Sequence, residues 1–157
     1  MKTTVNAPIK RLCRAVYDKY TDKLYVMTGA PALFLNGSSV YNDSSLEIYV
    51  DNPALDGAGT SGLFQLHYIK SIDYSYELMQ LRGYPNILVP KRERAFVEII
   101  RDDLNTIDEG IFYDTLNDYL FSSFRNDEKF REAADHFNVP WEKVQYHIDE
   151  ALAYEDC

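Results

Sequence analysis

Histidine and cysteine are the residue types that most often bind a metal ion or act as a nucleophile, and this chain has few of them. Its three histidines, His67, His136 and His147, have no histidine or cysteine four residues away, and its two cysteines are Cys13 and Cys157. A zinc site needs closely spaced ligands. The sequence also lacks a Gly-x-Ser-x-Gly elbow and a phosphate-binding P-loop. We therefore expect no metal site and no cofactor.

Carboxylates are the other groups that could do chemistry, and the segment leading to Glu47 indicates what they could do. A β-prone run reaches Thr28, Gly29 interrupts it, residues 30–35 predict a short buried helix, and an alternating strand follows at residues 46–50. This order resembles the opening of the nucleotidyltransferase fold. In that family, a strand–glycine–helix unit holds a triphosphate through backbone N–H groups. The next strand carries Asp-x-Asp, whose hard carboxylate oxygens bind two Mg²⁺ ions.

The metal positions of this pattern are incomplete. Placed on the family motif, they fall at Ser45 and Glu47, and the third carboxylate, on a later strand, would be Glu77. A serine hydroxyl is a poor replacement for an anionic ligand, and Pro31 removes one N–H group from the phosphate-binding turn. The resemblance thus implies a nucleotidyltransferase-like fold that keeps only residual motif positions: Gly29, Ser45, Glu47 and Glu77. The alternative is a nucleotidyltransferase whose atypical metal site uses Glu47 and Glu77.

About residues 8–150 also resemble a more particular group, the C-terminal domain of AbiEi-type antitoxins. In that family, a sheet poor in Asp and Glu leads to a segment of the type Val-x-x-x-Glu-Arg-Ala-Leu-x-Asp, which starts the helices. Here residues 88–98 read Leu-Val-Pro-Lys-Arg-Glu-Arg-Ala-Phe-Val-Glu. Full AbiEi proteins have an N-terminal winged helix-turn-helix, but only about 23 residues precede the first strand here. The resemblance therefore implies a non-enzymatic antitoxin-like or immunity-like protein of a toxin–antitoxin or phage-defence system, without direct DNA binding.

Negative charge is concentrated in the last third of the chain. The net charge is +2 for residues 1–50, −1 for residues 51–100 and −10 for residues 101–157. Such a surface repels phosphate backbones, so we expect no direct nucleic-acid partner. Three interpretations stay open: a solvated helical exterior, a docking face for a basic, toxin-like protein, or a DNA-mimicking inhibitor from a mobile element. The candidate partner-binding residues are Asp102, Asp103, Asp108, Glu109, Asp114 and Asp118.

A small basic cluster precedes the acidic region. Lys91, Arg92 and Arg94 surround Glu93 at a predicted helix start, where positive charge is unfavourable beside the helix dipole. The cluster could bind a phosphate or an acidic partner. The alternative is an ordinary solvated first turn.

The elements that must position these residues form an α+β pattern, because strands come first and helices follow as a group. We expect a small mixed β-sheet of about four to five strands, an N-terminal helix and a C-terminal group of about four helices. The predicted strands are Leu24–Thr28, Leu46–Val50, Leu63–Ile69, Tyr76–Leu81 and Asn86–Val89. The predicted helices are 9–20, 30–35, 91–101, 108–124, 126–137 and one from Pro140 with Trp141, Val144, Ile148 and Leu152 inward.

The organisation predicted is a single domain over residues 1–157, because no Gly/Ser linker interrupts the chain. Its first half, residues 1–90, holds the helix and the sheet, and its second half, residues 91–157, holds the acidic helices. No apolar run approaches a membrane span, and no signal-peptide core follows Met1. We therefore expect a cytoplasmic protein without a membrane partner.

Overall fold

The fold is α+β, as predicted, and a computed structural model describes residues 2–3, 13–14, 24–37, 46–55 and 64–154. The strands are β1 (Lys2–Thr3), β2 (Tyr25–Thr28), β3 (Leu46–Val50), β4 (Phe64–Tyr68), β5 (Leu78–Leu81) and β6 (Tyr84–Pro90). The helices are α2 (Gly29–Leu35), α3 (Arg92–Arg101), α4 (Glu109–Leu120), α5 (Asp127–His136) and α6 (Trp141–Tyr154), with a 3-10 turn at Pro53–Leu55. The predicted N-terminal helix lies mostly outside the described residues, although Cys13 and Arg14 are helical.

The strands form one mixed sheet in the order β1-β5-β6-β2-β3-β4. The central strand β2 is parallel to β6 and antiparallel to β3, and β3 is parallel to the edge strand β4. Five of these strands were predicted, and the two-residue β1 was not. Alternation sets the faces of β4, because Phe64 and Leu66 are buried while Gln65 and His67 are partly exposed.

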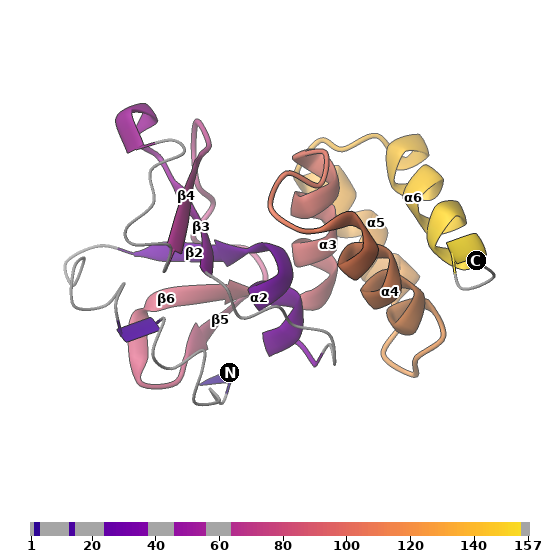
Figure 1. Cartoon of the computed structure of the whole chain (residues 1–157), viewed down its shortest axis with the longest axis horizontal. Helices are drawn as coiled ribbons and strands as arrows, with labels where there is room; N and C mark the ends of the chain where they lie inside the picture. The colour runs from indigo at the N-terminus through magenta and orange to yellow at the C-terminus, as the bar shows by residue number, and fades with distance from the viewer. Residues whose placement is uncertain (1, 4–12, 15–23, 38–45, 56–63, 155–157) are drawn as a thin grey trace.

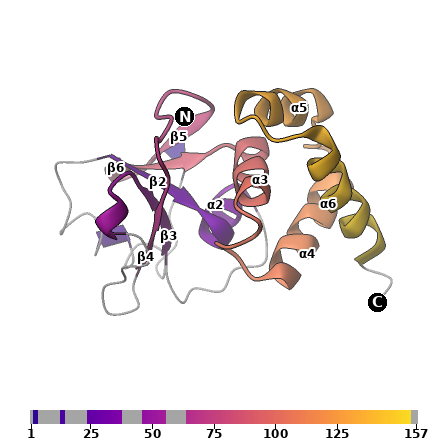
Figure 2. The same ribbon diagram turned by 90° about the horizontal axis from the view of Figure 1, so that it is seen from above.

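The molecule has a layer of strands and a layer of helices, which meet at α2 and α3. Figure 1 shows the strands on one side and helices α4, α5 and α6 on the other, with α2 and α3 between them, and Figure 2 shows the same division from above. Helix α3 is buried from Arg94 to Ile100 because it is covered from both sides. Phe96 lies at its centre and contacts the rings of Phe112, Tyr119 and Phe130.

Three predicted boundaries differ from the structure by two residues or more, and one predicted core residue is exposed. The strand expected from Tyr76 begins only at Leu78, because Glu77 has φ +48 and bends the backbone. The helix expected to reach Phe124 ends at Leu120. The strand expected to begin at Asn86 begins at Tyr84, so β6 already includes Pro85.

Leu152 is 40% exposed, and the neighbouring Ala151 is buried in its place. The reason is the close approach of α6 to α4. The Asn117 side chain donates a hydrogen bond to the Ala151 carbonyl at 2.9 Å, and a small residue permits this contact. Among the described residues, no helix has both the length and the apolar character needed to cross a membrane.

Candidate functional site

The start of α2 is covered by another part of the protein. Gly29 opens the helix with φ +71, and a Cβ atom placed there would lie 2.2 Å from the Thr106 carbonyl oxygen. The loop between α3 and α4 therefore packs directly on the glycine at the position where the nucleotidyltransferase pattern would hold phosphate. Pro31, two residues later, supplies no N–H group. Gly29 is required here for a close backbone contact.

Glu47 on β3, which the predicted motif would use as a metal ligand, also has a partner within the protein. The Glu47 carboxylate lies 2.8 Å from the Nε2 atom of His67 on the adjacent strand β4. Ser45 lies outside the described residues. A carboxylate that faces an imidazole lacks the second anionic ligand that two-metal catalysis needs. Within the described part of the chain, no group of three His, Cys, Asp or Glu side chains could hold a metal ion.

Glu77 does not join Glu47, and the expectation that it lies in a strand is wrong. It occupies the bend before β5, and its carboxylate pairs with Lys91 at 3.7 Å and with Lys129 at 3.4 Å. Strands β6 and β2 separate β5 from β3 in the sheet. The structure therefore does not assemble the atypical metal site from Glu47 and Glu77.

The basic cluster divides into three different environments. Lys91 pairs with Glu77, while Arg92 donates a hydrogen bond to the Asn36 carbonyl and places its guanidinium 4.8 Å from the centre of the Phe124 ring. Arg94 is 1% exposed, and its guanidinium donates hydrogen bonds to Glu98 and to the Asp73 carbonyl inside the protein. This corrects the expectation of one anion-binding cluster, because burial removes Arg94 from the exterior.

Three of the candidate partner-binding acids have structural roles. Asp102 accepts a hydrogen bond from the Tyr49 hydroxyl at 2.6 Å, and Asp103 pairs with Lys143 at 2.8 Å. Asp108 caps α4 by accepting the Ile111 N–H at 3.1 Å.

The other three candidates, Glu109, Asp114 and Asp118, are exposed on α4. Asp114 and Asp118 lie one turn apart, and among the described residues neither has an ion-pair partner. These acids are therefore the part of the predicted docking face that is free to meet another molecule.

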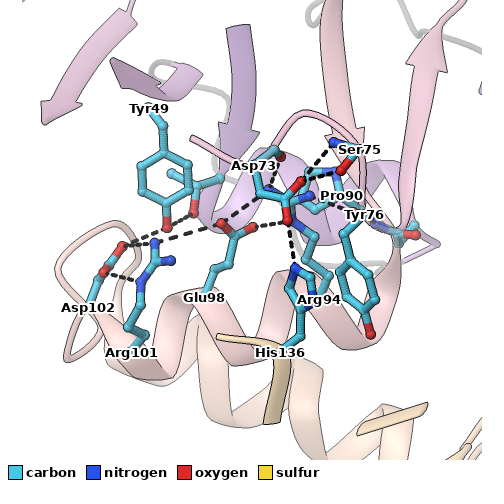
Figure 3. Close-up of polar contacts among 12 residues, drawn as sticks. Tyr49, Asp73, Ser75, Tyr76, Pro90, Arg94, Glu98, Arg101, Asp102 and His136 are labelled. Carbon is cyan, nitrogen blue, oxygen red and sulfur yellow. Dashed lines mark hydrogen bonds and ion pairs between the residues drawn. The ribbon is translucent and has the colours of Figure 1, made fainter. Parts of the chain in front are cut away.

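An ionic network, buried at Arg94 and Glu98 and partly exposed at Arg101 and Asp102, links the sheet to α3, and Figure 3 shows its members pointing toward one another. Arg94 Nε donates to Glu98 Oε1 at 2.9 Å, and Arg101 lies 3.7 Å from the same carboxylate. Arg101 also binds Asp102, which in turn accepts the Tyr49 hydroxyl. Burial raises the pKa of Glu98, and the neighbouring Arg94 opposes this rise. Burial, with Glu98 and Asp102 nearby, raises the pKa of Tyr49 well above its ordinary value.

The sequence analysis missed this network. Its only signal is the spacing of Arg94, Glu98 and Arg101 at three and four residues, which places them on one side of a helix. Exposed helices show the same spacing, so the burial could not be inferred from it.

A polar cavity of about 290 Å³ lies next to the network, lined by residues that include Asp73, Glu98, Arg101 and His136. His136 Nε2 lies 2.6 Å from Asp73 Oδ2, and its ring stacks on Tyr76 at 3.9 Å. Asp73 also accepts hydrogen bonds from the N–H and hydroxyl groups of Ser75, both at 2.8 Å. The lining carboxylates thus already have partners within the protein. The contacts of His136 with Asp73 and Tyr76 hold the loop before β5 against α5.

The contacts of Asp73 predict an acid-dependent stability. The hydrogen bond with His136, followed by the one from the Ser75 N–H, lowers the pKa of Asp73 from 3.8 to about 2. A carboxyl with a lowered pKa stabilises the fold above its unfolded value, and this contribution is lost as the pH falls from about 4 toward about 2. We expect Asp73→Asn to flatten this part of the pH profile of the free energy of unfolding, measured by urea denaturation. Asp135→Asn, an exposed change on the same helix as His136, should leave the slope unchanged, and an equal loss of slope would contradict the assignment.

A second cavity, an open groove of about 220 Å³, lies between α2, α3 and α4. Leu33, Phe96 and Tyr119 line it, and Arg92, Asp118 and Phe124 also border it. We call it the α2–α4 groove.

Two exposed phenylalanines follow α4, and one of them, Phe124, borders this groove. Phe121 is 69% exposed and Phe124 is 66% exposed, whereas Phe96, Phe112 and Phe130 are at most 1% exposed.

Comparison of the chain with known protein families and with curated proteins finds no match in either set.

Proposed function

We propose that the protein is a non-enzymatic, antitoxin-like or immunity-like protein that neutralises a basic partner protein by binding it. The observation that carries this proposal is the internal occupation of the nucleotidyltransferase-like positions. The Thr106 carbonyl packs on Gly29, and His67 pairs with Glu47. In this strand–glycine–helix unit, groups of the same chain occupy the positions that a nucleotide and a metal ion would take. Such a unit is suited to a structural role and not to nucleotide transfer. The same proposal places the protein and its partner in the cytoplasm, within a toxin–antitoxin or phage-defence system.

The acidic helices support the choice of a basic partner. Residues 101–157 hold a net charge of −10, and Glu109, Asp114 and Asp118 of α4 are exposed. Opposite charges across an interface speed association and disfavour partners of the wrong charge. A protein with a basic active face, such as a toxin that handles nucleotides or nucleic acid, has the complementary charge.

The test of neutralisation is co-expression of the full chain with the product of the neighbouring gene. We expect the pair to co-purify and the chain to restore growth when that product is toxic. A triple change, Glu109→Lys, Asp114→Lys and Asp118→Lys, should weaken both effects. Failure to co-purify with or protect against any neighbouring product would overturn the proposal.

Nucleotide binding is the separate test of the enzymatic alternative. Calorimetry of the full chain with ATP or GTP and Mg²⁺ should detect no binding, because Glu47 is engaged by His67 and Gly29 is covered by Thr106. Micromolar binding that disappears in Glu47→Gln would contradict the proposal and favour a nucleotidyltransferase with an atypical site. His67→Ala serves as a control, since it removes the imidazole that contacts Glu47 and leaves the carboxylate in place.

A further inference from the structure

The α2–α4 groove combines three features that point to a docking surface. It is hollowed, with a volume of about 220 Å³, and Leu33 and Phe96 supply apolar lining. Phe124 borders the groove, and Phe121 lies three residues earlier at the end of α4. An exposed aromatic ring at the border of an apolar hollow enlarges its apolar surface, and contiguous apolar surfaces mark interaction sites.

Phe124 is held in place although it is exposed. The Arg92 guanidinium lies 4.8 Å from the centre of its ring, and Arg92 is itself anchored by a hydrogen bond to the Asn36 carbonyl. An aromatic ring that is already oriented loses little conformational freedom when a partner covers it. Phe124 thus has the properties of a preformed anchor at the groove.

The charge around the groove favours one kind of occupant. Asp118 borders the groove and Asp114 lies one turn before it, both exposed and without an ion-pair partner among the described residues. The groove lining contains the cation Arg92, whose guanidinium is held by the Asn36 carbonyl and the Phe124 ring, and nearby Arg125 pairs with Asp127 at 2.8 Å. Arg92 is only partly exposed, whereas Asp114 and Asp118 are both exposed, so the charge available to an occupant is mainly negative. A second copy of the chain, with its net charge of −9, is a poor fit.

From this geometry we infer that the α2–α4 groove docks a partner segment in which basic residues alternate with large apolar residues. The apolar side chains contact Phe121, Phe124 and the groove, and the basic side chains pair with Asp114 and Asp118. This inference rests on the proposed function, because it names the surface and the partner chemistry for that binding.

The probe is a set of short synthetic peptides in which lysine or arginine alternates with leucine or phenylalanine. A matched set has glutamate at every basic position. We expect the basic set to shift the backbone amide resonances of residues 33–37 and 115–124 in the full chain, and the acidic set to shift none. Phe124→Ser should raise the dissociation constant, measured by fluorescence anisotropy, by more than about tenfold. Phe121→Ser is a second variant, and both changes are at exposed positions that do not remove core packing.

Matched controls lie on α6. Tyr146 is 58% exposed there, and Tyr146→Ser should leave peptide binding unchanged. Asp118→Lys should weaken binding several-fold, whereas Asp149→Lys, the same charge change at an exposed α6 position, should not. Equal weakening by both charge changes would overturn the inference, because it would indicate a general effect of net charge.

Other outcomes separate this inference from the proposed function. Peptide-induced shifts on another face, or no binding of the basic set, would overturn the groove assignment, while neutralisation of a neighbouring gene product would still support the proposed function. A dimer seen by sedimentation and lost in Phe124→Ser would also overturn the groove inference, since a second copy of the chain would then be the occupant. Nucleotide binding through Glu47 would instead overturn the proposed function itself.

Discussion

Replacing Arg94 by leucine is expected to lower the free energy of unfolding by about 3–5 kcal/mol. Arg94 and Glu98 are each 1% exposed, and the arginine also donates hydrogen bonds to the backbone carbonyls of Asp73 and Tyr76. The single change leaves the Glu98 carboxylate buried, and among the described residues Arg101, at 3.7 Å, is then the cation paired with it. A buried charge that loses its partner is among the costliest defects in a protein core. Urea denaturation followed by circular dichroism measures the loss.

Two further variants show whether the cost comes from the unpaired charge. Arg94→Leu combined with Glu98→Leu should recover part of the stability, because no charge then remains unpaired, although the carbonyls of Asp73 and Tyr76 still lack their donors. Arg125→Leu removes an exposed pair with Asp127 and should cost at most about 1 kcal/mol. If the double variant were as unstable as the single one, loss of arginine packing, and not an unpaired charge, would be the cause.

The kinds and order of the elements could be predicted because their periods differ clearly. Alternation at residues 46–50 gives β3, and spacings of three and four residues around Phe96 and Phe130 give α3 and α5. Asn126, predicted as the first residue of this helix, caps α5 by accepting the Lys129 N–H at 3.0 Å. These signals are local, and a single sequence carries them.

Burial of polar residues could not be predicted, because it depends on how distant elements pack. The sequence places Arg94 in a basic helix start, which normally faces solvent. In the structure, α3 is covered by the sheet on one side and by other helices on the other, so Arg94 meets Glu98 inside. The pairing of His136 with Asp73 joins residues 63 positions apart and has no local signal.

The exposure of Phe121 and Phe124 could not be predicted for a different reason. Phe124 lies four residues after Leu120, so a helical pattern extends through both. The chain leaves the helix after Leu120, and the Ser122 hydroxyl donates to the Tyr119 carbonyl at 2.8 Å. Serine side chains compete for backbone hydrogen bonds in this way and favour helix ends. The turn carries Phe121 and Phe124 outward.

Gly29→Ala is expected to destabilise the protein by about 2–5 kcal/mol without any nucleotide present. An alanine at φ +71 is strained by about 1–2 kcal/mol. Its Cβ atom would also lie 2.2 Å from the Thr106 carbonyl oxygen, so the loop between α3 and α4 must move. Such overpacking costs about 1–3 kcal/mol more. Thermal and urea denaturation measure the total, and hydrogen exchange of residues 102–108 reports the displaced loop.

Gly83→Ala separates the two contributions. Gly83 has φ +85, and a Cβ atom placed there would meet nothing within 4 Å. It should therefore cost only the backbone strain, about 1–2 kcal/mol. The difference between the two variants measures the contacts of a Cβ atom at Gly29, chiefly with the Thr106 carbonyl at 2.2 Å and also with the Glu47 side chain at 3.0 Å. Equal costs would mean that the loop does not press on the glycine. A Gly29→Ala protein as stable as the unmodified chain would favour a phosphate-binding role for this turn. A Gly29→Ala cost well above that of Gly83→Ala would instead assign Gly29 to the junction between the sheet and the acidic helices.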